Sequence, residues 1–438
     1  MSLLRRQFLS LFASTSTLAM RTAQADSPPP AMPHVPWSRQ AAIYELNVRQ
    51  HTADGTLKAA AADLPRLKGM GVDIVWLMPI QPIGVVNRKG TLGSYYSIRD
   101  YVAVNPEFGT LADARAFVQA AHAQGMRVIL DWVANHTAFD HPWTRDHKDW
   151  YKLDAHGEIF PVTFNAGSPN EEHWSDVTAL NYDAPALRDA MIAAMQFWLR
   201  ETDLDGFRCD VASLVPTPFW ERARRELDAV KPMFMLAESD AVDLHRSAFD
   251  MTYSWDLARL FHEIGQGKAG AAELRAWAAK EPHGFPPSAY RMRFTTNHDF
   301  NSWNGTDAEL YGDNYLPLAV LTFTLPGMPL IYGGQEARLT KRLEFFEKDA
   351  VDWKTRELQP FYTRLLALKH AHPALANGQY GGAMTMLDVG NERLFAFRRA
   401  LGADSVSVVV NVTASEQALR LGADDRKLPA HGWLVEPA

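Results

Sequence analysis

The feature that most constrains the fold is a regular alternation of short apolar runs with longer helical stretches between residues 37 and 371. Helical periodicity separates the runs, for example at 111–124, 184–200, 218–230 and 269–279. The eight runs are residues 41–47, 73–78, 127–131, 206–210, 233–238, 248–253, 291–296 and 330–332. Strands that alternate with helices are typical of parallel βαβ units, and eight such units predict a (β/α)8 barrel. A doubly wound open sheet is the alternative, but no Gly-rich phosphate loop follows the first run.

Two further segments depart from this alternation. Residues 137–183, between the third and fourth runs, are rich in Trp, His, Asp, Asn, Gly and Pro and have little periodicity. A long unpatterned segment inside a compact domain is usually functional, so we expect an excursion domain over the barrel mouth. Residues 375–438 contain β-like runs separated by turn residues. They predict a C-terminal antiparallel β domain after the catalytic domain of residues 37–371.

The first 36 residues have the pattern of an export signal and a linker. Arg5 and Arg6 precede an apolar stretch that ends near Met20, and Ala23 and Ala25 form an A-x-A cleavage site. This pattern predicts a twin-arginine-type signal peptide at residues 1–25, with an amphipathic helix of the mature fold as the alternative. The apolar stretch is too short to anchor the chain in a membrane. We therefore expect a Pro-rich linker at residues 26–36 and a periplasmic or secreted protein.

The composition indicates which class of molecule the protein binds. The net charge of −7 argues against nucleic acid, which normally requires a basic patch. Thirteen Trp, 13 Tyr and 22 Phe suit a neutral carbohydrate, because aromatic faces stack on sugar rings, although most of these side chains will be core. Cys209 is the only cysteine, so no intramolecular disulfide can form.

Polar side chains end several of the predicted strands. In a (β/α)8 barrel the active site lies at the carboxyl ends of the strands, so polar residues there are candidates for function. These residues are Asp131, Asn135 and His136 after the third run, Arg208 and Asp210 in the fourth, Glu238 in the fifth, and Asn297, His298 and Asp299 after the seventh. Asp131 taken alone suits a structural role, and Asn135 suits a calcium ligand or a loop brace equally well. A zinc site is not expected, because no H-E-x-x-H spacing is present.

In combination these segments resemble the α-amylase family, glycoside hydrolase family 13, over nearly the whole chain from the first strand onward. The matching motifs occur in the family's order: Ser94–Tyr101, Asp131–His136, Leu180–Asn181, Gly206–Val211, Glu238, Phe294–Asp299 and Gly327–Glu336. The resemblance implies that Asp210 is a nucleophile, that Glu238 is the general acid and base, and that Asp299 stabilises the transition state. It also implies that His136 and His298 bind sugar hydroxyls and that Tyr96 stacks on the sugar ring.

The spacing of the carboxylates agrees with these roles. Retaining glycosidases place two carboxyl groups about 5–5.5 Å apart, which is close to the ~4.8 Å between neighbouring strands. Arg208 lies two residues before Asp210, so the two side chains share one face of a strand. We expect Arg208 to keep Asp210 ionised, and burial beside other carboxylates to raise the pKa of Glu238.

The sequence also departs from the family pattern. Ser213 and Leu214 stand where starch-degrading members have a Lys-His pair, Ser97 replaces a common Asp, and Ser239 and Asp240 follow Glu238. These departures leave the cleavage residues intact but argue against the usual calcium site, so we expect no required cofactor or metal. We expect a monomeric retaining hydrolase that acts on α-glucans or malto-oligosaccharides. The alternatives are a transglycosylase or sucrose/trehalose-type enzyme, and a non-catalytic sugar-binding or partner subunit.

Overall fold

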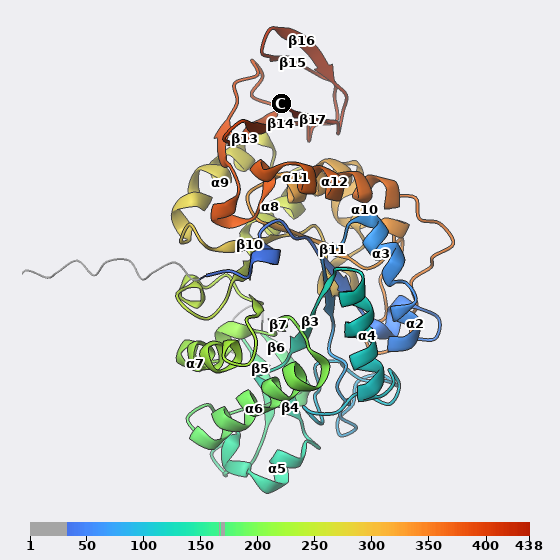
Figure 1. Cartoon of the computed structure of the whole chain (residues 1–438), viewed down its shortest axis with the longest axis vertical. Helices are drawn as coiled ribbons and strands as arrows, with labels where there is room; N and C mark the ends of the chain where they lie inside the picture. The colour runs from blue at the N-terminus through green and yellow to red at the C-terminus, as the bar shows by residue number, and fades with distance from the viewer. Residues whose placement is uncertain (1–32, 166, 168–170) are drawn as a thin grey trace, which may run out of the picture. The chain divides into compact units, whose positions relative to one another are not determined.

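The computed structural model describes residues 33–165, 167 and 171–438, and the described chain forms one compact unit. Its centre is a closed barrel of eight parallel strands in the order β1-β11-β10-β9-β8-β7-β3-β2 (Figure 1). The strands are β1 (Ile43–Leu46), β2 (Ile74–Leu77), β3 (Arg127–Trp132), β7 (Gly206–Cys209), β8 (Phe234–Ala237), β9 (Met251–Tyr253), β10 (Tyr290–Arg293) and β11 (Met328–Tyr332). The predicted (β/α)8 barrel is therefore confirmed, and the open-sheet alternative is wrong. The signal-peptide prediction for residues 1–25 lies outside the described residues.

Helices surround the barrel (Figure 1). Several begin at recognisable caps: the Thr110 side chain accepts from the backbone of Asp113, and the Asp113 side chain accepts from Thr110, at the start of α4. The α-helices are α1 (Val48–His51), α2 (Leu57–Ala61), α3 (Leu64–Met70), α4 (Leu111–Ala123), α5 (Pro142–Asp146), α6 (Pro185–Thr202), α7 (Thr217–Asp228), α8 (Trp255–Gly265), α9 (Ala271–Gly284), α10 (Asp307–Tyr311), α11 (Tyr315–Thr324) and α12 (Gln359–Ala371).

The barrel strands divide their side chains between two cores. Alternate residues such as Ile43, Trp76 and Ile129 pack together in a cluster inside the barrel. Their neighbours Tyr44 and Val75 join a second cluster with the surrounding helices. Strand side chains alternate between faces, so strands buried on both faces must be almost wholly apolar. This explains the continuous apolar runs and makes the polar residues at the strand ends stand out.

The excursion after β3 contains a small antiparallel sheet. Strand β6 (Glu172–Ala179) pairs with both β4 (His136–Ala138) and β5 (Pro161–Phe164). The first half of β6 is mostly exposed, so the strand lacks the apolar pattern of a core strand. The sequence predicted an excursion here, and its strands were missed for this reason.

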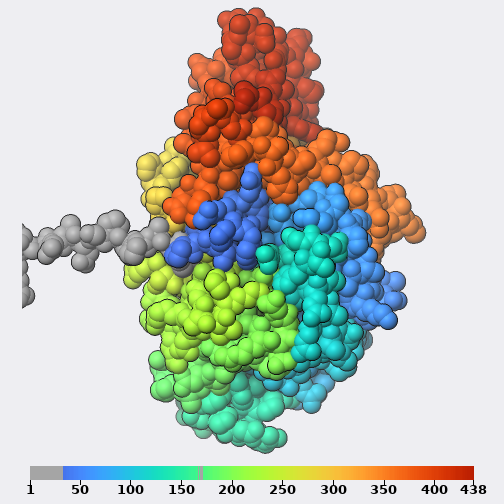
Figure 2. Space-filling view, viewed as in Figure 1, coloured from blue at the N-terminus to red at the C-terminus, as the bar shows by residue number. Residues whose placement is uncertain are grey.

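The C-terminal part folds into antiparallel sheets that pack against the barrel helices. One sheet has the order β12-β13-β14-β17, and β15 and β16 form a separate hairpin. The strands are β12 (Ala383–Met386), β13 (Phe395–Leu401), β14 (Asp404–Val410), β15 (Gln417–Leu421), β16 (Asp424–Leu428) and β17 (Trp433–Pro437). The buried Arg399 side chain donates to the carbonyl of Thr324 at the end of α11, 3.2 Å away. Figure 2 shows the red C-terminal residues lying against the orange segment that contains α11 and α12.

The described chain also includes residues before the barrel. His34 is buried and bonds Asp250 through Nδ1, at 2.6 Å, and the Ser288 carbonyl through Nε2, at 2.7 Å. Ordered packing therefore begins by His34, two positions before the predicted end of the linker. Among the described residues, no helix is both long enough and apolar enough to cross a membrane.

Gly206 is required by the close approach of β7 and β8. A Cβ atom added at this position would lie 1.8 Å from the carbonyl oxygen of Phe234 on β8. We predict that Gly206→Ala lowers the free energy of unfolding by about 1–3 kcal/mol or more, because two strands must separate. The control is Gly69→Ala in α3, where an added Cβ meets no atom within 4 Å. It should stabilise the helix by about 0.5–1 kcal/mol. Thermal melting followed by circular dichroism measures both, and equal melting temperatures for the two variants would contradict the prediction.

Candidate active site

The polar strand ends meet in one cavity at the carboxyl end of the barrel. The cavity has a volume of about 970 Å³. Six of the seven predicted site residues line it: Tyr96, His136, Asp210, Glu238, His298 and Asp299. The seventh, Arg208, has a fully buried side chain that contacts Asp210 and Glu238. The structure thus brings together every residue that the sequence nominated.

Arg208 is the centre of the charge network. Its Nη1 donates to Asp131 Oδ1 at 2.9 Å and to Asp210 Oδ1 at 3.2 Å. Its Nη2 lies 2.9 Å from Glu238 Oε2. Its Nε donates to the Tyr253 hydroxyl at 3.2 Å. One planar guanidinium group therefore fixes the two carboxylates proposed to react, in the fork geometry that a lysine cannot reproduce.

Asp131 has the structural role that its position suggested. It is fully buried and accepts hydrogen bonds from Arg208, from Trp76 Nε1 at 3.1 Å and from the Tyr96 hydroxyl at 3.0 Å. The last of these bonds fixes the ring of Tyr96, which is the side chain expected to stack on a sugar. Asp131 thus orients two predicted site residues and lies outside the group that lines the cavity.

Glu45 is a buried charge at the site that the sequence analysis missed. It is fully buried, and its carboxylate bonds Nδ1 of His298. His298 Nε2 lies 2.8 Å from the Tyr96 hydroxyl and 3.3 Å from Asp299 Oδ2. Burial alone would lower the pKa of His298, but the charges of Asp299 and Glu45 outweigh it and raise this pKa to about 9. The signal was present in the sequence, since Glu45 is a lone charge inside the first apolar run.

Glu238 is held by a strained backbone. Its Oε2 accepts the backbone N–H of Val211 at 2.8 Å. Val211 has φ 35° and ψ 47°, a left-handed conformation that is a marked outlier for a β-branched residue. Such strain costs of order 1–3 kcal/mol and is concentrated at functional sites. The strained turn after Asp210 therefore places the backbone N–H of Val211 where it can donate to Glu238, and the strain lowers the stability of the fold.

The pKa of Asp210 is shifted in the direction opposite to the one that Arg208 alone would produce. Burial and the nearby charge of Glu238 raise its pKa well above the usual range, and Arg208 opposes this only in part. Arg208 also binds Asp131 and Glu238, so its charge is shared among carboxylates and does not belong to Asp210 alone. Burial raises the pKa of Asp299 as well. Burial and Glu238 therefore oppose the ionised form of Asp210, an effect that our expectation from Arg208 alone did not include.

His136 contributes a neutral imidazole. Burial lowers its pKa to about 4, so it is uncharged at neutral pH. Its Nε2 lies 4.0 Å from Asp210 Oδ2, and its Nδ1 is 3.2 Å from the Asn135 side chain. The two histidines of the site thus differ in charge, one a neutral donor or acceptor and the other a cation.

Aromatic side chains form the walls of the cavity, and the sequence analysis did not identify them individually. Trp174 and Phe164 from the excursion sheet stack at 5.0 Å, and Trp174 lies against the ring of His136 at 5.6 Å. On another side are Trp303, Phe345 and Phe346, and the Phe345 ring is nearly parallel to Tyr96 at 6.3 Å. The adjacent phenylalanines after the eighth strand were the available signal. These rings provide flat surfaces suited to sugar faces.

The sequence analysis gave two roles for Asn135, a calcium ligand or a brace for its loop. Its side-chain amide is engaged by His136, which agrees with the loop-brace interpretation. Within residues 33–165, 167 and 171–438, no three His, Cys, Asp or Glu side chains converge as metal ligands. Calcium can also be held by carbonyl oxygens, so its absence stays a prediction.

Comparison with known proteins gives a consistent result. The model of the α-amylase catalytic domain matches residues 42–232. A crystal structure of an α-amylase from Lactobacillus plantarum is 30% identical, with a TM-score of 0.82, covering 92% of this chain and 99% of that one. A noncanonic maltogenic α-amylase from Thermotoga neapolitana is 29% identical, with a TM-score of 0.78, covering 91% and 96%. The α-amylase MalA of Haloarcula japonica is 29% identical over 88% of this chain, which spans 57% of that protein's length.

The raised pKa of Asp210 has a consequence for stability. A carboxyl group with a raised folded-state pKa favours folding below its unfolded pKa of about 3.9, and this contribution is lost as the pH rises to the folded value. We predict that Asp210→Asn stabilises the protein at pH 7 by about 0.5–2 kcal/mol. The gain should shrink towards zero as the pH falls to 4.

Melting temperatures measured from pH 4 to pH 8 test this prediction. The exposed Asp183 provides the control, because Asp183→Asn removes a carboxyl group that does not line the cavity. A stability gain for Asp210→Asn that did not depend on pH would rule out titration of the carboxyl group as its cause.

Proposed function

This chain belongs to the α-amylase family of glycoside hydrolases, and we propose that it cleaves the α-glucosidic bonds of α-glucans or malto-oligosaccharides with retention of anomeric configuration. The observation that carries the proposal is the contact of one guanidinium, Arg208, with both Asp210 and Glu238. Two carboxylates held by one planar group lie near each other, which supports the short separation of about 5–5.5 Å that a retaining enzyme uses. An inverting enzyme needs about 6.5–9.5 Å, to fit a water molecule between carboxylate and sugar.

The reaction proceeds in two displacements. Asp210 attacks the anomeric carbon while Glu238 gives a proton to the leaving oxygen, which forms a covalent glycosyl-enzyme. Glu238 then removes a proton from water, which attacks the same carbon and releases the sugar from Asp210. In the sugar-free site burial raises the pKa of Asp210. The positive charge that develops on the sugar beside Asp210 favours its ionised form at the moment of attack.

The other side chains bind the sugar ring that is transferred. Asp299 lies beside the cationic His298, and together they can accept from and donate to neighbouring hydroxyls. Tyr96, oriented by Asp131, supplies a face for stacking, and the neutral His136 bonds a hydroxyl near Asp210. The charge of Asp299 also stabilises the oxocarbenium-like transition state.

The names of the matched relatives support α-linked glucose as the substrate, since they are an α-amylase and a maltogenic α-amylase. Ser213 and Leu214 in place of a Lys-His pair favour short chains over long starch segments. We further propose that the enzyme requires no cofactor or metal, works as a monomer and is exported by the signal at residues 1–25.

Loss of the nucleophile should abolish turnover. We predict that Asp210→Asn lowers kcat on maltotriose or soluble starch on the order of 10⁶-fold, the size of the loss when a serine protease loses its covalent nucleophile. The fold should survive, because the substitution removes a destabilising charge. Reducing-sugar release measures the rate, with Asp183→Asn as the control. Turnover by Asp210→Asn within tenfold of the wild type would exclude this residue as the nucleophile.

The anomer released first reports the stereochemistry. Two successive inversions at the anomeric carbon preserve the α configuration, so we predict that the first product is the α-anomer. Proton NMR resolves the two anomeric signals within minutes of mixing enzyme with maltotetraose, before mutarotation equilibrates them. Initial release of the β-anomer would mean a single displacement, in which Asp210 activates a water molecule and does not attack the sugar itself.

A further inference from the structure

The two ends of the active-site cavity are built differently. A glycosidic oxygen that receives a proton from Glu238 must lie beside it, so the leaving part of the sugar extends over the β8 side. There the lining residues Ser213, Leu214 and Asp240 are exposed, Leu214 by 43%. In the closed ring β8 is diametrically opposite β1, and β1 is flanked by β2 and β11. The transferred part of the chain therefore extends towards the loops that follow β2 and β11.

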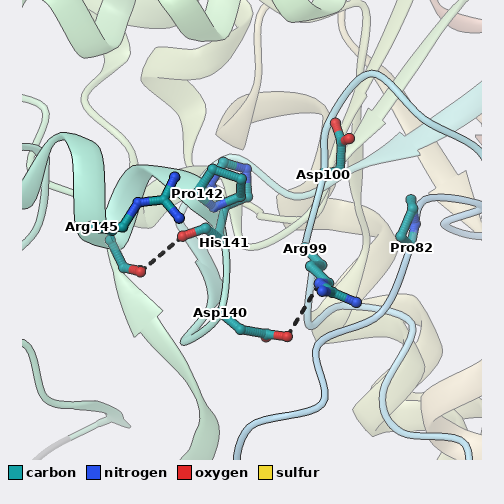
Figure 3. A pocket seen from close by; sticks show the side chains of 8 residues that line it. Pro82, Arg99, Asp100, Asp140, His141, Pro142 and Arg145 are labelled. Carbon is teal, nitrogen blue, oxygen red and sulfur yellow. Dashed lines mark hydrogen bonds and ion pairs between the residues drawn. The ribbon is translucent and has the colours of Figure 1, made fainter.

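The loop after β2, residues 84–94, is joined to the excursion sheet along one edge. Lys89 Nζ lies 3.1 Å from Asp176 Oδ1 on β6, and Ser97 Oγ donates to the Asp176 carbonyl at 3.0 Å. Further out, the backbone N–H of Val85 donates to Asp140 Oδ2 at 3.1 Å. Arg99 contacts the same carboxylate at 3.2 Å, as Figure 3 shows. These contacts hold the loop against the excursion sheet at the edge of the active-site cavity, where Lys89 and Asp176 both line it.

The same loop is joined to the segment after β11 along its other edge. The backbone N–H of Leu92 donates to the Phe346 carbonyl at 3.1 Å, and that of Thr91 donates to Glu347 Oε1 at 2.8 Å. Gly90 lies so close that an added Cβ would be 2.5 Å from Cβ of Phe346. Three segments distant in sequence thus form one continuous wall, which we call the glycone wall: residues 84–94, Asp176 and residues 345–347.

An aromatic floor leads from the reaction centre to the glycone wall. The Tyr96 ring is nearly parallel to Phe345, and Phe345 packs on Phe346 at 5.2 Å. Lys89 Nζ lies 6.0 Å from the Phe346 ring centre. Lys89 and Asp176 both line the cavity, and Asp176 is almost fully buried. A buried carboxylate paired with an ammonium at the end of an aromatic floor is suited to the terminal hydroxyl groups of a sugar chain.

We propose that the enzyme takes the non-reducing end of an α-glucan and acts from that end, with Lys89 and Asp176 as the pair that binds the terminal glucose and stops the chain. This inference rests on the proposed function and adds the direction and the position of attack. Binding energy is gained only when a chain end meets the glycone wall, because a chain that continued past it would collide with Lys89 and Asp176. Products should therefore be short and of one size, whatever the length of the substrate.

Substrates blocked at one end test the direction of attack. Maltoheptaose with a 4,6-O-benzylidene group on its non-reducing glucose is compared with maltoheptaitol, which is altered at the opposite end. We expect the wild type to cleave maltoheptaitol readily. It should cleave the benzylidene compound at least about 100-fold more slowly, because the blocked ring cannot fit against the wall. Equal rates on the two compounds would overturn the inference and leave the proposed function standing. Failure to cleave either compound, or unmodified maltoheptaose, would instead count against the proposed function.

Variants of the pair test its role. Lys89→Ala and Asp176→Asn should each raise the ratio of benzylidene-maltoheptaose to maltoheptaitol cleavage about tenfold and lengthen the products. The matched control is Lys148→Ala, which removes an exposed lysine of the excursion that pairs with Glu158 at 2.8 Å and does not line the cavity. Its ratio should equal that of the wild type, and melting temperatures check the fold of all three variants. An unchanged ratio in both folded pair variants would refute the assignment to Lys89 and Asp176.

Discussion

The active site contains fewer buried positive charges than buried carboxylates, and the rest of its structure depends on this imbalance. The single side chain of Arg208 contacts Asp131, Asp210 and Glu238, and it has no exposed surface. Removing Arg208 from this group would leave buried carboxylates without a compensating charge, which is costly. Because a single cation serves three carboxylates, not all of them can ionise at low cost. Burial and the charge of Glu238 accordingly raise the pKa of Asp210, and Arg208 offsets them only in part.

A second cation repeats this arrangement on the other side of the sugar position. Glu45, buried in the first strand, holds His298 in its charged form, and His298 in turn lies beside Asp299. The Tyr96 hydroxyl connects the two groups, because it bonds both Asp131 and His298. Residues from opposite sides of the barrel are therefore fixed by one hydrogen-bond network. Such a network holds its members in place before any sugar arrives, which is the condition for electrostatic stabilisation of a transition state.

The sequence predicted this centre well because a barrel imposes simple rules. Strands buried on both faces must be apolar, so Asp210, Glu238 and Asp299 were conspicuous at the ends of their runs. Glu45 follows the same rule but lies inside its run, where we did not look for a charge. The glycone wall could not be predicted, because Lys89 and Asp176 are 87 positions apart and their meeting depends on loop conformation. The excursion strands and the hairpin of β15 and β16 were missed because half-exposed strands lack a strong apolar pattern.

The closed ring of strands separates the chemistry from the choice of substrate. The reacting groups lie on strand ends, whose positions are set by backbone pairing and by packing as close as that of Gly206 on Phe234. The walls lie on loops, which can change without disturbing that pairing. Leu214 on the leaving-group side and Lys89 on the opposite side are both loop residues, and both lie outside the buried charge network. Selection can therefore alter the length of sugar that the enzyme accepts at little cost to the placement of Asp210 and Glu238, whereas any change at Arg208 affects three carboxylates at once.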